Sequence, residues 1–284
     1  MKNNALLLRC AALGCALLLS ACATGPLGMR GASHEFTSEN QDSRAQFLII
    51  HYTVTDWPGS VRALTQAGRG VSAHYLVRDE PASVYQLVDE NRRSWHAGAS
   101  YWAGSQNLNS ASIGIEIVNL GYTDTPAGRI YAPFPQAQID EVVRLAKDIQ
   151  ARHHIKPENV LGHSDIGPGR KQDPGPMFPW KQFFDAGIIA WPDAAQVAVS
   201  QARFEAQGLP DVMWLQEKLG RFGYDVPHSG VPDARTRDVV QTFQMKYRPG
   251  NISGDLDAET AALIDVATTK GGMLMVTPIA PPKP

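Results

Sequence analysis

The arrangement of apolar positions in the first half of the chain predicts a β-sheet with a core on both faces. Residues 47–54 form a continuous β-prone run, which is typical of a strand covered on both sides. Shorter β-prone runs occur at 73–78 and 83–88, separated by a turn that contains Pro81. These runs predict three strands.

A fourth β-prone run, at 112–120, alternates between two faces. Ile113, Ile115 and Ile117 share one face, and the two-residue period of a strand places Glu116 on the other. A carboxylate among apolar neighbours carries a desolvation cost. Glu116 is therefore a candidate functional residue rather than a structural one.

The clearest helical pattern lies at 136–153. Its apolar residues repeat as on one face of an amphipathic helix, at Ile139, Val142, Val143, Ala146 and Ile149. A shorter helix is expected around 60–67. After a strand or turn at 160–163, residues 167–176 are so rich in proline and glycine that they predict an irregular loop.

Helical spacing returns in the last quarter of the chain, around 212–222 and 239–247. Residues 191–208 lack a strong core pattern and are interpreted as a linker that could be helical in part, and residues 268–284 as a disordered tail. The predicted fold class is therefore α/β. A mixed central β-sheet flanked by helices occupies 46–190, and a small all-α domain of three helices occupies 209–267.

The first 21 residues have the pattern of an export signal, with basic residues near an apolar stretch that ends at small residues. The signal ends in Leu19-Ser20-Ala21-Cys22, which resembles a bacterial lipobox and predicts lipidation of Cys22. An ordinary secretory signal is the alternative. Residues 22–45 would then be a tether. Because Ala23 is not an aspartate retention signal, similarity to enteric lipoproteins points to a lipid anchor in the outer membrane, on its periplasmic face.

Charge and cysteine content narrow the possible partners and ligands. A formal net charge of −2 offers no basic excess for nucleic acid. All three cysteines lie within the first 22 residues, so the mature chain has no disulfide and no thiolate metal ligand. A transition metal would have to be bound by histidine and carboxylate. Nothing in the sequence indicates an obligate protein partner.

Three residues match the needs of a catalytic metal site, which takes about three protein ligands and leaves one position open for water. His51 ends the first predicted strand, and His163 and Asp173 flank the proline- and glycine-rich loop. A loop that folds back could bring them together. Each is weak evidence alone, because a single histidine on a strand is more often a structural core residue.

Six short motifs in order strengthen this interpretation. They are Ile50-His51-Tyr52-Thr53, Ser72-Ala73-His74-Tyr75-Leu76-Val77, Ser94-Trp95-His96-Ala97-Gly98, Ser112-Ile113-Gly114-Ile115-Glu116, Gly162-His163-Ser164-Asp165-Ile166 and Lys171-Gln172-Asp173-Pro174-Gly175. Over residues 45–187 the chain thus resembles the type 2 N-acetylmuramoyl-L-alanine amidases, a zinc family that also includes phage lysozyme-like amidases and peptidoglycan recognition proteins.

The resemblance implies roles for particular residues. One Zn²⁺ would be bound by His51, His163 and Asp173, while Glu116 would move the proton of the attacking water and Lys171 would face the developing oxyanion.

Three further residues have open roles. His74 and His96 would bind or orient substrate, orient the ligands, or be structural. Asp165 is a rival ligand, although a turn residue is the favoured interpretation.

The C-terminal stretch 210–266 is similar to the three-helix peptidoglycan-binding domain of many wall hydrolases, a helical cap being the alternative. Together the resemblances predict hydrolysis of the amide between the lactyl group of MurNAc or anhydroMurNAc and L-Ala, on peptidoglycan or muropeptides, in wall turnover or recycling. The competing functions are a binding module without catalysis and a zinc peptidase. The sequence lacks the H-E-x-x-H motif of such a peptidase. Because the predicted ligands all precede residue 190, the second domain is expected to be dispensable for small substrates.

Overall fold

A computed structural model describes residues 31–33 and 35–276 of the chain. The chain divides into two units, 1–42 and 43–284. The described part of the first unit contains no helix or strand. The predicted export signal and Cys22 lie outside the described residues. No helix in the described part of the chain is long and apolar enough to cross a membrane.

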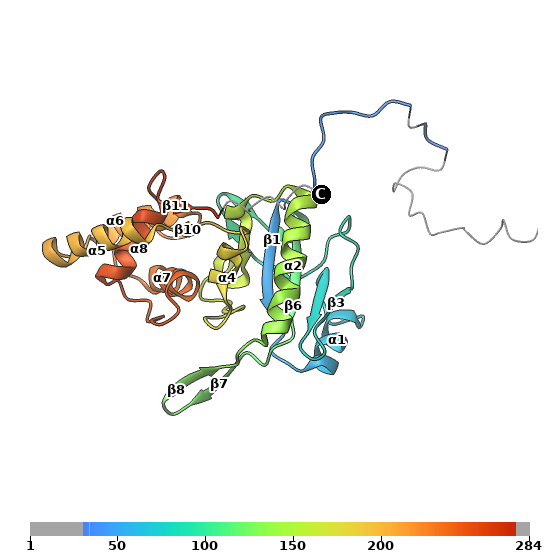
Figure 1. Cartoon of the computed structure of the whole chain (residues 1–284), viewed down its shortest axis with the longest axis horizontal. Coiled ribbons are helices and arrows are strands. Elements are labelled where there is room, and N and C mark those ends of the chain that lie inside the picture. Colours follow the sequence, from blue (N-terminus) through green and yellow to red (C-terminus); the bar gives the residue numbers. More distant parts are fainter. Residues whose placement is uncertain (1–30, 34, 277–284) are drawn as a thin grey trace, which may run out of the picture. The chain divides into compact units, whose positions relative to one another are not determined.

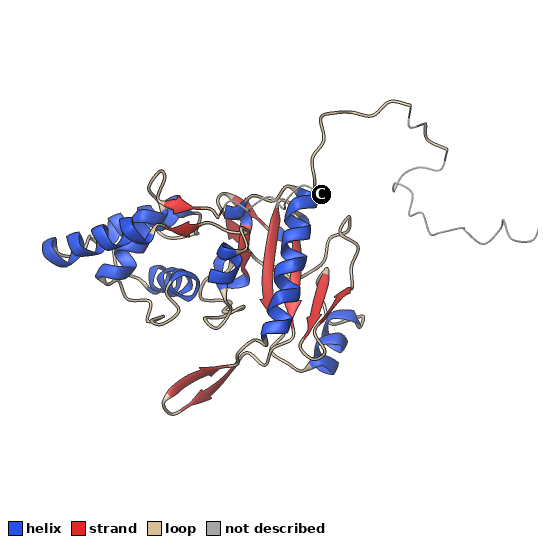
Figure 2. Ribbon diagram, viewed as in Figure 1, coloured by secondary structure: helices blue, strands red, loops and turns tan. Residues whose placement is uncertain are grey.

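The second unit is built around a five-stranded mixed sheet, which confirms the predicted fold class (Figure 1, Figure 2). The strands lie in the order β3-β2-β6-β1-β9, and all neighbours are parallel except β2 and β3. Their bounds are β1 (Phe47–Tyr52), β2 (Tyr75–Arg78), β3 (Ser83–Gln86), β6 (Ser112–Ile117) and β9 (Val160–Gly162).

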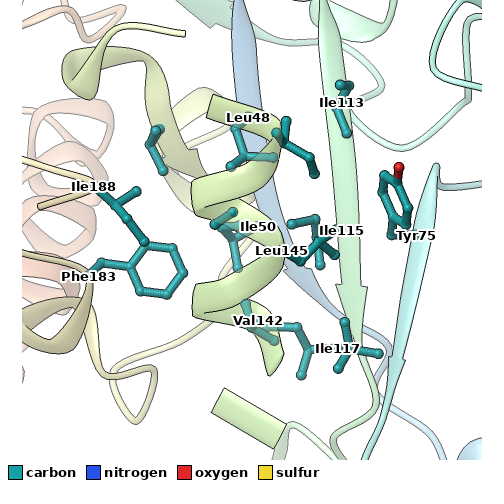
Figure 3. Close-up of a cluster of buried hydrophobic side chains, with 14 of the residues drawn as sticks. Leu48, Ile50, Tyr75, Ile113, Ile115, Ile117, Val142, Leu145, Phe183 and Ile188 are labelled. Atoms are coloured by element: carbon teal, nitrogen blue, oxygen red, sulfur yellow. The ribbon is translucent and has the colours of Figure 1, made fainter. Parts of the chain in front are cut away.

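One face of this sheet packs against the predicted amphipathic helix, which the structure contains as α2 (Gln136–His153) (Figure 3). Leu48 and Ile50 of β1 and the isoleucines of β6 belong to the same buried cluster as Val142 and Leu145 of α2. The alternation in both strands therefore separates this core face from the opposite face, on which Glu116 lies.

Shorter elements surround the sheet. They are α1 (Trp57–Thr65), β4 (Tyr101–Trp102), β5 (Ser105–Gln106), η1 (Leu108–Ser110), β7 (Tyr122–Thr125), β8 (Gly128–Tyr131), η2 (Pro157–Asn159), α3 (His163–Ile166) and α4 (Trp180–Asp185). α1 begins at Asp56, whose side chain accepts a hydrogen bond from the backbone NH of Gly59. β7 and β8 form a hairpin that extends from the sheet (Figure 2).

The segment predicted as a linker, 191–208, is mostly helical in the structure. α5 (Ala194–Gln207) begins at the capping residue Asp193, and its buried Phe204 packs against α8 (Ala258–Ala267). Only two residues of α5 are buried. So few buried positions give no strong periodicity, which is why the pattern did not reveal the whole helix.

In the C-terminal helical region, residues 194–267, α5 precedes the three helices that the sequence predicted within 209–267, of which α8 is the last. The other two are α6 (Val212–Phe222) and α7 (Ala234–Tyr247). The predicted disordered tail also starts too early, because β11 (Met273–Leu274) pairs antiparallel with β10 (Trp191–Pro192). Residues 277–284 of that tail lie outside the described residues.

The helical region shares a core with the second face of the sheet. Phe47, Ile49 and Leu161 from the sheet belong to one buried cluster with Leu219 and Phe243 from the helices. Gly223, at φ +134°, lets the end of α6 approach the Trp102 ring, where a Cβ would lie 2.9 Å from Trp102 Cε2. This continuous core argues against the expectation that the region is dispensable.

We therefore expect deletion of residues 209–284 to destabilise the amidase itself. The deletion would expose Phe47, Ile49, Leu161 and Ile166, each of which is now at most 4% exposed. Burying a large apolar side chain contributes about 1.5–3 kcal/mol, so exposing these four should lower the free energy of unfolding by roughly 6 kcal/mol or more. Urea denaturation measures this loss, and turnover of a small soluble muropeptide should fall with it.

Deletion of residues 277–284 alone is the matched control, since it leaves every residue of the shared core in place. It should leave both measurements unchanged. A chain ending at 208 that turns over the small muropeptide at the wild-type rate would show that the two regions are separable after all.

Candidate active site

A pocket of about 210 Å³ opens where parallel strands β1 and β6 end. Its lining includes most of the residues that the sequence singled out, namely His96, Glu116, His163, Lys171 and Asp173, together with Tyr52, Thr53 and Trp95. His51 and Glu116 are register partners on the two strands. Residues opposite each other on neighbouring strands project from the same face, so the sheet itself places a histidine beside a carboxylate.

His163 and Asp173 reach the same place because the loop between them closes on itself. His163 follows β9 directly as the first residue of α3. The backbone NH of Ser164 donates to the carbonyl oxygen of Asp173 at 2.8 Å. Pro174 packs against Gly162, where a Cβ would lie 2.8 Å from Pro174 Cδ. The missing side chain at Gly162 thus permits the fold-back that the sequence predicted only as a possibility.

The three predicted ligands converge on one point. His51 Nδ1 lies 2.9 Å from His163 Nδ1, and each of these nitrogens lies 3.0 Å from Asp173 Oδ2. All three residues are buried, and within the described residues theirs is the one cluster of histidine, cysteine or acidic side chains arranged to hold a metal ion. The predicted ligand set is thus assembled.

Hydrogen bonds on the far side of each histidine ring leave both Nδ1 atoms free to bind a cation. His163 Nε2 donates to the carbonyl oxygen of Ala97 at 3.1 Å. His51 Nε2 donates to His96 Nδ1 at 3.0 Å, and His96 Nε2 donates to Ser112 Oγ at 3.2 Å. In a neutral imidazole, the ring nitrogen that donates a hydrogen bond carries the proton, so the other ring nitrogen carries the lone pair. Two lone pairs and a carboxylate therefore face one another, an arrangement that a cation would stabilise.

Burial and neighbouring groups hold His51 and Asp173 in the protonation states that metal binding requires. Burial, with the neighbouring His163, lowers the pKa of His51 to about 4. Burial by itself would raise the pKa of Asp173, but the adjacent His163 and His51 hold it below its usual range. Neutral imidazoles and an ionised carboxylate are the forms that bind metals.

Glu116 has the features of a proton carrier. Burial, with the nearby charge of Asp173, raises the pKa of Glu116 to about 8. Its Oε2 is buried and has no hydrogen-bond partner among the described residues. A carboxyl group lining a pocket, with a pKa near neutrality and a free oxygen, can accept and return a proton at physiological pH.

His96 and His74 had the same candidate roles in the sequence, but only His96 lies at the pocket. His96 lines the pocket and touches the ligand His51, and its ring lies against Gly114, where a Cβ would be 2.5 Å from His96 Cγ. His74 has no exposed surface and does not line the pocket. It accepts a hydrogen bond from the backbone NH of Gly114 at 3.0 Å.

The expectation that His74 contacts substrate does not agree with this burial. Its contacts tie β2 to β6, which matches the structural alternative.

Asp165 does not join the cluster. It is 2% exposed, and its Oδ2 accepts a hydrogen bond from the backbone NH of Gly162 at 2.8 Å, which caps α3. This matches the role of a turn residue. Sequence reasoning missed the Ala97 carbonyl, which accepts from His163 and from Arg170 Nη2 at 3.0 Å. A backbone carbonyl leaves no signal in the residue types, so no pattern could have found it.

Two family profiles cover most of the second unit. One, described as N-acetylmuramoyl-L-alanine amidase, matches residues 41–176, and one for a peptidoglycan binding domain matches residues 208–264. The sequence is 43% identical over 267 residues to N-acetylmuramoyl-L-alanine amidase AmiD of Escherichia coli K12, covering 90% of this chain and 96% of AmiD. It is 40% identical over 116 residues to 1,6-anhydro-N-acetylmuramyl-L-alanine amidase AmpD of the same strain, covering 40% of this chain and 56% of AmpD.

Solved structures give the same relationship. AmpDh3 from Pseudomonas aeruginosa, in complex with an anhydromuramic pentapeptide, is 41% identical with a TM-score of 0.76, over 84% of this chain and 97% of AmpDh3. E. coli AmiD, in complex with anhydro-N-acetylmuramic acid-L-Ala-D-γ-Glu-L-Lys, is 42% identical with a TM-score of 0.73, over 84% of this chain and 94% of AmiD. Because the similarity runs through both matched regions and nearly the full length of AmiD, the chain belongs to the family of N-acetylmuramoyl-L-alanine amidases.

Proposed function

We propose that the chain is a zinc-dependent amidase in which His51, His163 and Asp173 bind one Zn²⁺ ion. The observation that carries the proposal is the convergence of two Nδ1 lone pairs and one carboxylate oxygen at about 3 Å spacings. Nitrogen and oxygen donors in this number are typical of catalytic zinc, which keeps a further position open. Zinc bound there would lower the pKa of water towards about 7 and polarise the amide carbonyl.

The protein's own groups supply the proton transfer and charge stabilisation. Glu116 takes the proton of the attacking water on its unpartnered oxygen and returns it to the leaving amine of L-alanine. Lys171 lines the same pocket and stabilises the charge that develops on the carbonyl oxygen. His96 fixes the tautomer and ring orientation of His51 rather than serving only as a substrate contact.

The proposed substrates are muropeptides in which the lactyl group of MurNAc or anhydroMurNAc is joined to L-alanine. AmpDh3 and AmiD bind anhydromuramic peptides in their solved complexes, and this chain shares their fold and has a region that matches a peptidoglycan binding domain. A role in wall turnover or recycling fits such substrates. The complete ligand set and Glu116 disfavour a binding module without catalysis. The sequence has no H-E-x-x-H motif, which disfavours a zinc peptidase.

Product analysis tests this reaction directly. Purified enzyme should convert anhydroMurNAc-tripeptide into free anhydroMurNAc and an intact tripeptide that begins with L-alanine, as read by mass spectrometry. The matched control is a substrate whose lactyl–alanine amide is replaced by an N-methyl amide. Release of single amino acids with the sugar–peptide bond intact would instead identify a peptidase.

We propose that Cys22 anchors the protein by acyl chains to the periplasmic face of the outer membrane. The support is the lipobox-like sequence ending at Cys22, together with the periplasmic or cell-wall location implied by a peptidoglycan substrate. Radiolabelled palmitate should enter the wild-type protein but not Cys22→Ser, and wild type should fractionate with the outer membrane. Cys15→Ser is the control. Equal labelling of wild type and Cys22→Ser would rule out acylation at this residue.

A further inference from the structure

The loop that carries the metal ligands His163 and Asp173 is held from outside by the C-terminal helical region. Side chains from that region contact the loop at Asp165, Pro168 and Gly169. We propose that Tyr224 and Lys246 are positioning residues for the metal site, acting through Asp165. This inference rests on the proposed zinc site.

Asp165 is the centre of these contacts. Its Oδ1 accepts a hydrogen bond from the Tyr224 hydroxyl at 2.8 Å, and its Oδ2 lies 3.2 Å from Lys246 Nζ. The same Oδ2 caps Gly162, the residue just before His163. Asp165, Tyr224 and Lys246 are at most 6% exposed. The carboxylate therefore joins two side chains of the helical region to the turn from which His163 projects.

Lys246 holds the strand as well as the turn. Its Nζ donates to the carbonyl oxygen of Val160, at the start of β9, at 3.1 Å and lies 4.3 Å from the centre of the Trp180 ring. A buried ammonium group is tolerated only when its charge and its protons are matched. Here one carboxylate, one carbonyl and one aromatic face provide that match, and all three come from residues 160–180, outside the C-terminal helical region.

Two further contacts restrain the middle of the loop. Arg235 Nη1 donates to the carbonyl oxygen of Pro168 at 2.7 Å. Gly169, at φ +74°, lies so close to Asp238 that a Cβ would overlap the aspartate side chain. Both partners lie on α7, as Lys246 does. One helix of the C-terminal region therefore touches the loop at several points between the two ligands.

A metal site of this kind depends on the geometry of groups behind its ligands, and changing such groups typically weakens metal binding by about 10–100-fold. Because coupling free energies are reciprocal, contacts from the helical region that strengthen zinc binding also mean that bound zinc stabilises the helical region by the same free energy. The C-terminal region would thus form part of the metal site in addition to binding the cell wall.

The test compares Tyr224→Phe with the matched variant Tyr247→Phe in the full-length protein. Both tyrosines are buried residues of the same region and each substitution removes one phenolic hydroxyl, but only the Tyr224 hydroxyl donates a hydrogen bond to Asp165. Zinc affinity is measured by competition with a chromophoric chelator. Tyr224→Phe should bind zinc about 10–100-fold more weakly than wild type, whereas Tyr247→Phe should bind it as wild type does.

A second pair separates positioning from general loss of stability. Lys246→Met removes the partner of Asp165, and Lys218→Met removes the bridge to Asp265 within the helical region, at 2.8 Å. The absorption spectrum of Co²⁺ bound in place of zinc should change in Lys246→Met and stay unchanged in Lys218→Met. If Lys246→Met does not fold, the tyrosine pair decides the question alone.

The outcomes distinguish the two proposals. Tight zinc binding by wild type, together with equal affinity in Tyr224→Phe, would overturn the positioning role and leave the metal site intact. Equal losses of zinc affinity in Tyr224→Phe and Tyr247→Phe would show that the effect comes from general packing, and would also overturn the positioning role. A wild-type protein that binds no zinc would overturn the metal site and the positioning role together.

Discussion

His163→Ala should be purified without stoichiometric zinc and without measurable amidase activity. The substitution removes one of three ligands and leaves His51 and Asp173 facing each other, 3.0 Å apart, without the third donor. Two remaining ligands cannot complete the three-donor set of a catalytic zinc site. Atomic absorption of the purified protein and turnover of anhydroMurNAc-tripeptide, both relative to wild type, measure the effect.

His228→Ala is the matched control, because His228 is exposed and lies outside the pocket. It should keep one zinc per chain and full activity. Denaturation of His163→Ala in urea shows whether the loss reflects unfolding instead of lost ligation. A folded His163→Ala protein with one zinc and wild-type turnover would contradict the assignment of this ligand.

Glu116→Gln should keep its zinc but lose about 10²- to 10⁴-fold in turnover, the usual contribution of a positioned general acid or base. The amide has nearly the same shape as the carboxylate but cannot carry the proton of the attacking water. Because Glu116 is not among the three converging ligands, metal content should be unchanged. Turnover and zinc content measured on one preparation separate chemistry from binding.

The same substitution should stabilise the metal-free protein at neutral pH. Burial raises the pKa of Glu116 to about 8, above its ordinary value near 4.5. As pH rises through 4.5 the unfolded chain loses the proton first, so Glu116 lowers stability progressively until pH exceeds about 8. Glu116→Gln removes this pH-dependent loss of stability. Its free energy of unfolding in urea should therefore exceed that of wild type by more at pH 8 than at pH 4.

Glu141→Gln provides the control, since Glu141 is a partly exposed residue of α2 that pairs with Arg144 and does not line the pocket. It should change neither turnover nor the pH dependence of stability. A fully active Glu116→Gln enzyme would show that another group carries the proton. If both predictions for Glu116 hold, its carboxylate lowers the stability of the metal-free protein but is required for catalysis.

Local periodicity was enough to predict the main strands and the long helix from residue types alone. The continuous apolar run of β1 and the alternation of Ile113, Ile115 and Ile117 in β6 both reflect burial of whole strand faces. The helix at 136–153 was predicted with the bounds that α2 has. Such patterns survive in sequence because every second or third residue meets the same environment.

The residue types of the site were also present in the sequence, through six ordered motifs that no single residue could have replaced. His51 and Glu116 could be placed on strands, and the proline- and glycine-rich loop after His163 could be identified. What the motifs left open was whether the loop returned Asp173 to His163. That depended on Pro174 packing against Gly162, a contact between residues twelve positions apart.

The packing of the C-terminal region against the sheet and the difference between His74 and His96 could be seen only in the folded chain. α5 buries just two residues and so escaped the pattern, while Leu219 and Phe243 share a core with the sheet across a large separation in sequence. His74 and His96 occur in equally clear motifs, yet one has no exposed surface and the other borders the pocket. Periodicity records whether a residue is buried, but the partner against which it is buried is a property of the folded chain, because contacts between distant segments leave no repeat in the sequence.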